Sequence, residues 1–231
     1  MPERPDPDDI GEYLISARSF EEYIAMFALR PDDLTGRILD CPGGGSGFTA
    51  GANAAGARAT AADPVYARPP DVLARHVLQE TDRGSAHTIA GSDRYVWDYY
   101  GDAAGHLKIR AASARAFGQD LIEHSERYVP ASLPDLPFGD GEFDLVLSSH
   151  FLFTYADRLD AGDHRSALIE LLRVSRGEVR VFPLLDLGGH SQEALLRQVI
   201  GELTGLGIAC TLRRTDYEFQ RGGNEMLVLA R

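Results

Sequence analysis

Apolar residues near the start of the chain recur at helical spacing. A helix buries one face when its apolar positions fall three or four residues apart, and the residues with this spacing are Phe20, Tyr23, Ile24 and Phe27. Ser19 precedes them and Glu22 follows three residues later, which is the arrangement of a capping box. The first 30 residues therefore predict a polar tail followed by an amphipathic helix.

Two short apolar runs flank a glycine-rich turn in residues 36–63. The first run contains Ile38, an alanine-rich helical stretch covers residues 48–55, and the second run ends at Ala62. A strand, a turn, a helix and a second strand within about 30 residues make up a parallel crossover unit. This part predicts two parallel strands of one sheet.

Residues 64–128 contain helical patterns and no convincing strand. The helical patterns cover residues 71–79, 93–100 and 107–125. Because a connection between neighbouring strands is usually much shorter, we expect this segment to be a helical cap inserted between the second and third strands.

Strand and helix patterns alternate in the remainder of the chain. The expected elements are strands at 143–149 and 178–183, helices at 164–174 and 192–203, and a closing hairpin of 208–219 and 225–229. Alternation predicts a doubly wound, mostly parallel α/β sheet, and the hairpin predicts an antiparallel edge. The length of 231 residues fits a single domain over residues 1–231.

Charge and cysteine content exclude several classes of protein. A net charge of −12 would repel a polyphosphate, so we expect no nucleic-acid partner. Cys41 and Cys210 form no disulfide or metal-binding pattern, so we expect no metal centre. The acidic start does not resemble a signal peptide, and no run approaches the roughly 20 apolar residues of a membrane span. A soluble, cytoplasmic protein with no membrane partner is the expectation.

The glycine-rich turn is the strongest chemical signal, and residues 40–48 read Asp-Cys-Pro-Gly-Gly-Gly-Ser-Gly-Phe. Glycines at such a turn bring bare backbone and a helix start close to a ligand. The turn lacks the Gly-Lys-Ser/Thr ending of a phosphate-binding loop, which excludes an NTPase. It also fails the GxGxxG spacing of dinucleotide sites. A nicotinamide-dependent oxidoreductase stays open only by analogy of fold.

The turn follows a different pattern more closely. Asp40 ends a hydrophobic strand, Gly44 is the central glycine and Phe48 opens the helix, while Pro42 and Ser46 stand where further glycines are usual. This arrangement resembles motif I of the class I S-adenosylmethionine-dependent methyltransferases.

Two further segments strengthen this resemblance. Asp63 ends the second run, at the position where the family's acidic residue holds both ribose hydroxyls, and a carboxylate can accept two hydrogen bonds from a diol. Residues 136–149, Leu-Pro-Phe-Gly-Asp-Gly-Glu-Phe-Asp-Leu-Val-Leu-Ser-Ser, are similar to the segment that leads into the family's fourth strand. The resemblance covers residues 36–63 and 129–231. It implies a Rossmann-like, seven-stranded sheet, with S-adenosylmethionine as cofactor and S-adenosylhomocysteine as product.

The resemblance also implies a set of cofactor-binding residues. The expected contacts are Tyr23, Asp40, Cys41, Pro42, Gly43, Gly44, Ser46, Phe48, Asp63, Ser132, Leu133 and Ser148. Ser132 stands where the family often has an acidic residue against the adenine, and serine can accept one hydrogen bond there. Tyr23 and Phe27 either close over the cofactor as a lid or pack on the sheet.

Candidates for the acceptor side lie beyond these motifs. His150 follows the fourth strand, at the sheet edge where ligands bind, and is either a catalytic base or a packed histidine at the rim. Phe27, Trp97 and Tyr100 are candidates for contact with the acceptor, with a place in a small core of the cap as the alternative for Trp97 and Tyr100.

The expected activity is methylation of a small molecule on oxygen, nitrogen or sulfur by in-line transfer. Such a reaction depends mainly on alignment of the reactants, and the long insertion can enclose an acceptor. The alternative is a non-catalytic, methyltransferase-like protein that binds the cofactor as a sensor or scaffold, because the sequence contains no diagnostic base.

Overall fold

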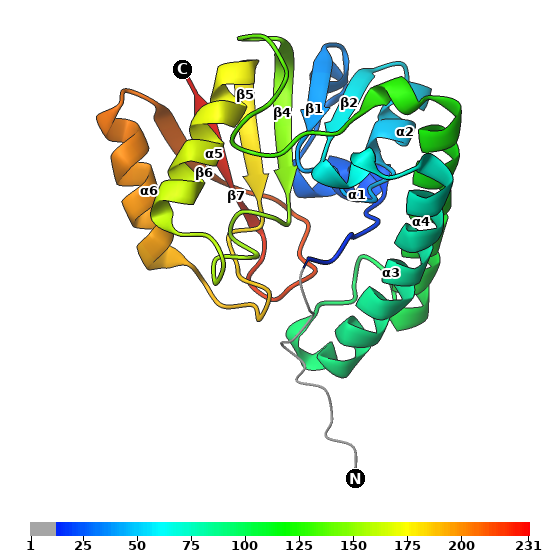
Figure 1. Ribbon diagram of the computed structural model, residues 1–231. Coiled ribbons are helices and arrows are strands. Elements are labelled where there is room, and N and C mark those ends of the chain that lie inside the picture. Colours follow the sequence, from blue (N-terminus) through cyan, green and yellow to red (C-terminus); the bar gives the residue numbers. More distant parts are fainter. Residues whose placement is uncertain (1–12) are drawn as a thin grey trace.

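The computed structural model describes residues 13–231, in which seven strands form a single sheet (Figure 1). The strands are β1 (Arg37–Asp40), β2 (Arg58–Ala62), β3 (Tyr128–Val129), β4 (Phe143–Ser149), β5 (Ser175–Phe182), β6 (Ala209–Arg214) and β7 (Glu225–Ala230). Their order is β3-β2-β1-β4-β5-β7-β6, in which β7 runs antiparallel to β5 and β6 and all other adjacent pairs are parallel. This topology confirms the predicted doubly wound, Rossmann-like sheet with an antiparallel hairpin. The predicted polar tail lies mostly outside the described residues.

The strand order creates a crevice at one edge of the sheet. The chain begins in the middle with β1, continues outward to β3, and returns to place β4 beside β1. Successive crossovers leave in opposite directions at this point, and ligands bind at such a reversal, outside the carboxyl ends of the strands.

Helices cover both faces of the sheet (Figure 1). Their bounds are α1 (Phe20–Met26), α2 (Phe48–Ala54), α3 (Pro70–Ala90), α4 (Ala103–Glu123), α5 (Ala161–Val174) and α6 (Glu193–Gly205). At the start of α1, Ser19 accepts from the Glu22 amide and Glu22 accepts from the Ser19 amide, which confirms the predicted capping box. No helix within residues 13–231 is long and apolar enough to cross a membrane.

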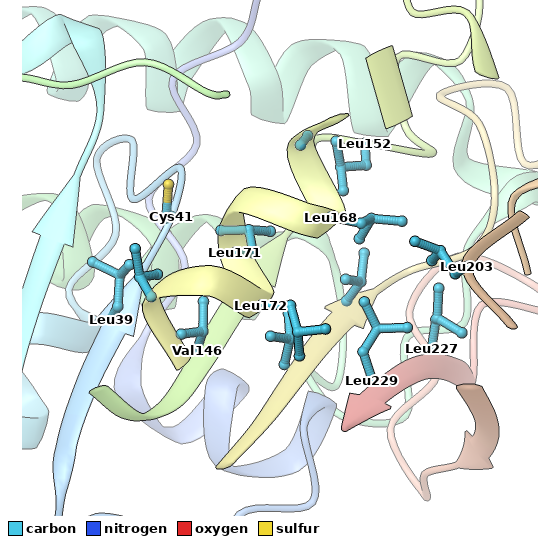
Figure 2. Close-up of a cluster of buried hydrophobic side chains, with 14 of the residues drawn as sticks. Leu39, Cys41, Val146, Leu152, Leu168, Leu171, Leu172, Leu203, Leu227 and Leu229 are labelled. Carbon is cyan, nitrogen blue, oxygen red and sulfur yellow. The ribbon is translucent and has the colours of Figure 1, made fainter. Parts of the chain in front are cut away.

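Alternate strand positions supply the two faces of the core, as the period of a β-strand requires. Leu39 and Val146 face α5, where they join Leu168, Leu171 and other leucines in the cluster of Figure 2. The residues that pack on α1 and α2 from the opposite face include Ile38, Leu145 and Leu147. Both faces of the central strands are therefore buried.

The long segment between β2 and β3 contains the two longest helices, which pack against each other and against the sheet. Phe117 and Leu121 of α4 and Val77 of α3 share a buried cluster with Ala61 of β2 and Tyr128 of β3. Figure 1 shows α3 and α4 beside the β3 edge, extending beyond the carboxyl ends of the strands. They form one wall of the crevice.

The prediction of a helix at residues 93–100 is wrong. A short 3-10 turn covers Ser92–Arg94, after which Tyr95 bridges to Gln220 and the Val96 amide donates to the Phe219 carbonyl. These long-range backbone contacts override the local helical pattern. β6 ends at Arg214, earlier than the expected strand of 208–219.

Candidate functional site

Two adjoining cavities open at the carboxyl ends of the strands. The larger, of about 290 Å³, lies against the glycine-rich turn and Asp63, and we call it the loop cavity. The smaller, of about 100 Å³, lies between the segment before α1 and helices α3 and α4, and we call it the arginine cavity. His150 and Tyr155 line both cavities. Figure 1 shows the segment before α1 running between the strand ends and α3.

Glycines shape the turn beside the loop cavity. Gly44 has a φ of +52°, which a residue with a side chain rarely adopts. A Cβ at Gly43 would lie 2.5 Å from the hydroxyl of Tyr66, which donates a hydrogen bond to the Gly44 carbonyl. The backbone of the turn is therefore held in one shape and lies directly against the cavity.

Asp63 connects this turn to the end of β2. One carboxylate oxygen accepts from the Gly44 amide at 2.9 Å and the other from the Val65 amide at 3.0 Å. The residue is 7% exposed, and burial raises the pKa of its carboxyl group against the opposing effect of the two amides. Each oxygen keeps acceptor capacity on the cavity side, because a carboxylate has about four lone-pair sites.

Asp40 lies beneath the turn and not at the cavity. It is fully buried, and its two oxygens are 3.0 and 3.2 Å from the hydroxyl of Tyr23, which donates to it. Burial raises the pKa of Asp40 well above its ordinary value, opposed by this hydrogen bond. Tyr23 itself lines the loop cavity, so Asp40 acts on the cavity by positioning Tyr23.

The structure brings most of the predicted cofactor-binding residues together. Those that line the loop cavity are Tyr23, Cys41, Pro42, Gly43, Gly44, Asp63, Ser132 and Leu133. Three others lie behind them in addition to Asp40. The Ser46 hydroxyl accepts from the Phe48 amide, Phe48 stacks on Tyr23, and the fully buried Ser148 has a hydroxyl with no partner within residues 13–231. These three side chains support the walls of the site from behind.

His150 lies where the two cavities meet, immediately after β4. Its backbone has a φ of +51°, and its Nδ1 is 2.8 Å from the hydroxyl of Ser149. Burial, followed by the positive charges of Arg18 and Arg110, lowers the pKa of His150 well below its ordinary value. The imidazole is therefore neutral near neutral pH.

The residues predicted to contact the acceptor do not line either cavity. Phe27 is fully buried between Tyr23 and Phe182, so this part of α1 packs on the sheet. Trp97 packs against His106 and Phe219. Tyr100 donates to the buried carboxylate of Glu22. All three are displaced from the cavities because they support residues that form the walls.

Sequence reasoning missed the polar residues of the arginine cavity. The side chains at its wall include Arg18, Glu80, Tyr95, His106, Arg110 and Phe219. One signal was available, because His106 and Arg110 fall on the same helical face as Phe117 and Leu121, seven and eleven residues after Arg110. A histidine and an arginine on a buried face indicate a polar cluster.

Comparison with known proteins shows sequence similarity to a family model and to one relative. A model described as "Methyltransferase domain" matches residues 84–182. "Uncharacterized protein MJ0045" of Methanocaldococcus jannaschii is 30% identical over 225 residues, which cover 96% of this chain and 98% of the relative.

Two solved structures were also similar. The PH0226 protein from Pyrococcus horikoshii OT3 has 11% identity and a TM-score of 0.47, over 90% of this chain and 87% of that one. The magnesium protoporphyrin IX methyltransferase from Synechocystis PCC 6803, with bound SAH, has 13% identity and a TM-score of 0.33, over 70% of this chain and 85% of that one.

Proposed function

Because the chain belongs to the class I S-adenosylmethionine-dependent methyltransferases, we propose that it methylates a small molecule that binds in the arginine cavity, with the cofactor in the loop cavity. The observation that carries the proposal is that the two cavities adjoin at His150. A transferase needs its two reactants side by side, and this arrangement supplies one compartment for each.

The loop cavity fits the chemistry of this cofactor. Asp63 would accept hydrogen bonds from the two ribose hydroxyls with the lone pairs that its amide contacts leave free. The bare backbone of Gly43 and Gly44 allows close approach, and Ser132 and Leu133 would hold the adenine end. When bound, S-adenosylmethionine supplies an electrophilic methyl group on a positively charged sulfur.

His150 would serve the acceptor. In the tautomer whose Nδ1–H donates to the Ser149 hydroxyl, Nε2 carries the free lone pair and would accept a proton or a hydrogen bond from the acceptor. A base is required only where the acceptor atom carries a proton that must leave. The neutral imidazole also adds no positive charge that would repel the sulfonium of the cofactor.

The small size of the arginine cavity supports a small acceptor. Its volume of about 100 Å³ suits a small organic molecule and not a macromolecule, and its walls come from several parts of the chain. The net charge of −12 disfavours a nucleic acid as the substrate.

Titration calorimetry with the full-length protein tests the assignment of the loop cavity. We expect binding of S-adenosylmethionine and S-adenosylhomocysteine but not of NAD. Replacing Asp63 by alanine should weaken binding of S-adenosylhomocysteine by about 1–3 kcal/mol, through lost charge-assisted hydrogen bonds. The matched control is Asp135→Ala, an exposed aspartate near Ser132 that does not line the cavity. Equal affinity in the two variants would remove Asp63 from the site.

A further inference from the structure

Two arginine side chains are buried at the wall of the arginine cavity. Arg110 projects from α4 and its side chain is 7% exposed, while Arg18 lies in the segment before α1 and its side chain is 13% exposed. Taking a guanidinium out of water is unfavourable unless a negative charge and hydrogen-bond acceptors replace the water. The surroundings of both groups therefore indicate what the cavity is built to hold.

The two guanidinium groups share a single carboxylate. Oε1 of the fully buried Glu22 is 2.8 Å from Nη2 of Arg110 but 3.9 Å from Nη1 of Arg18. The Glu22 carboxylate also accepts from the hydroxyls of Tyr100 and Tyr217. Arg18 is thus the more weakly paired of the two arginines.

No second carboxylate compensates Arg18 within residues 13–231. Glu80 lies at the cavity wall, but its oxygens are 2.9 Å from Nε and 2.6 Å from Nη2 of Arg83. His106 accepts from Nε of Arg110, and burial lowers the pKa of His106 to about 2, so it is neutral and cannot serve as a counter-ion. Two positive charges and one negative charge leave one positive charge at the wall.

Hydrogen-bond donors are unsatisfied as well. Nε and Nη1 of Arg18 and Nη1 of Arg110 are buried and have no hydrogen-bond partner in the described part of the chain. Buried charged donors are normally paired, so these nitrogens lack the acceptors that an oxyanion would bring.

We infer that the arginine cavity binds the acceptor through a carboxylate group of that acceptor, held by Arg18 and Arg110. The inference rests on the proposed function and specifies its substrate class as a small organic acid. One uncompensated charge matches a carboxylate monoanion, whereas a phosphate dianion would exceed it. The rings of Tyr95 and Phe219, stacked 4.7 Å apart at the same wall, offer an apolar surface for the remainder of the acid. The carboxylate is the group by which the acid is bound in this arrangement, and His150 lines both this cavity and the loop cavity.

Arg18→Met is the informative variant. The methionine keeps much of the length and the apolar stem of the side chain but removes the charge. The Arg18 carbonyl, which accepts from the Gly47 amide and the Ser113 hydroxyl, is unaffected. Glu22 keeps Arg110 as its partner, so the variant should unfold at the same denaturant concentration as the parent or at a higher one. The control is Arg75→Met, a largely exposed arginine of α3 away from the cavity.

The experiment measures binding of benzoate and of its neutral analogue benzamide to the protein saturated with S-adenosylhomocysteine. We expect benzoate to bind the parent and the Arg75 control, and to bind Arg18→Met at least about tenfold more weakly, because charge-assisted hydrogen bonds are lost. Benzamide should bind all three proteins weakly and equally. Absence of benzoate binding to the parent, or equal binding to Arg18→Met, would overturn the inference.

A second titration separates this inference from the assignment of the cofactor. The cofactor has an amino-acid carboxylate of its own, which is the other possible source of the oxyanion. Affinity for S-adenosylhomocysteine should change by less than about twofold in Arg18→Met. A loss of about tenfold or more would mean that Arg18 holds the cofactor's carboxylate and would overturn the inference. Failure of the parent to bind S-adenosylhomocysteine at all would instead contradict the proposed function.

Discussion

The loop cavity and the arginine cavity adjoin, yet they are built on different principles. The loop cavity is formed by the segments that follow β1, β2, β3 and β4 and by residues in and before α1, with Asp63 as the one carboxylate among its described lining residues. The arginine cavity depends on charged side chains from distant segments, with Glu22, Arg110 and Tyr217 meeting in one cluster. The first is shaped by steric limits on the backbone and the second by charge balance, so different changes should disrupt them.

The largest expected loss of stability follows from removing the negative charge that balances the two arginines at the arginine cavity. Glu22→Gln keeps the shape of the side chain but leaves two buried guanidinium groups without a counter-ion, which should reduce the free energy of unfolding by about 3–5 kcal/mol in urea denaturation. The control is Glu142→Gln, which removes a partly exposed pair with Arg37 and should cost at most about 1 kcal/mol. If the two variants lose equal stability, the contrast between the cavities fails.

Adding a methyl group to the glycine turn at the loop cavity should cause a smaller loss of stability. The Cβ of Gly43→Ala would meet the Tyr66 hydroxyl at 2.5 Å and the Ala61 Cβ at 2.9 Å, and such strain costs about 1–3 kcal/mol. Gly201→Ala in α6 has open space around the new methyl group, so it should stabilise by about 0.5–1 kcal/mol. Urea denaturation measures the stability of both variants. If Gly43→Ala is as stable as the parent, this turn is not sterically fixed.

The smallest expected effect is a loss of stability at low pH. His106 is neutral when folded, with burial and then Arg110 and Arg18 lowering its pKa to about 2, whereas the unfolded chain binds a proton there near pH 6.5. The unfolded state therefore holds more protons as the pH falls below 6.5, and the stability that depends on neutral His106 declines. Between about pH 7 and pH 5.5 the parent should lose roughly 1 kcal/mol more than His106→Gln. Parallel stability curves for the two proteins would contradict the buried, neutral state of His106.

The sequence predicted the loop cavity better than the arginine cavity for a physical reason. Gly43, Gly44 and Asp63 follow strands within one crossover unit, so local pattern is enough to place them at one edge of the sheet. The seven-stranded topology was predicted on the same basis, together with the resemblance in residues 36–63 and 129–231.

Long-range contacts account for what the sequence did not reveal. The aromatic residues Trp97 and Tyr100 lie behind the cavity wall because residues 95 and 96 pair with the backbone near Phe219. Arg18 and Arg110 are 92 positions apart and carry no local motif. Their shared environment exists only after the helices between β2 and β3 have docked on the sheet.

The hydrogen bond between Tyr217 and Glu22 spans 195 positions of the chain, and this has a consequence for biosynthesis. Glu22 can meet Tyr100 and Arg110 once α4 has been made, but its contact with Tyr217 must await the distant end of the chain, because so long a loop can close only after that end exists. The glycine turn and Asp63 can assemble on a nascent chain that still lacks its C-terminal hairpin. A prematurely terminated chain that ends before Tyr217 can therefore form the compartment assigned to the cofactor, but the compartment assigned to the acceptor is completed only in the finished polypeptide.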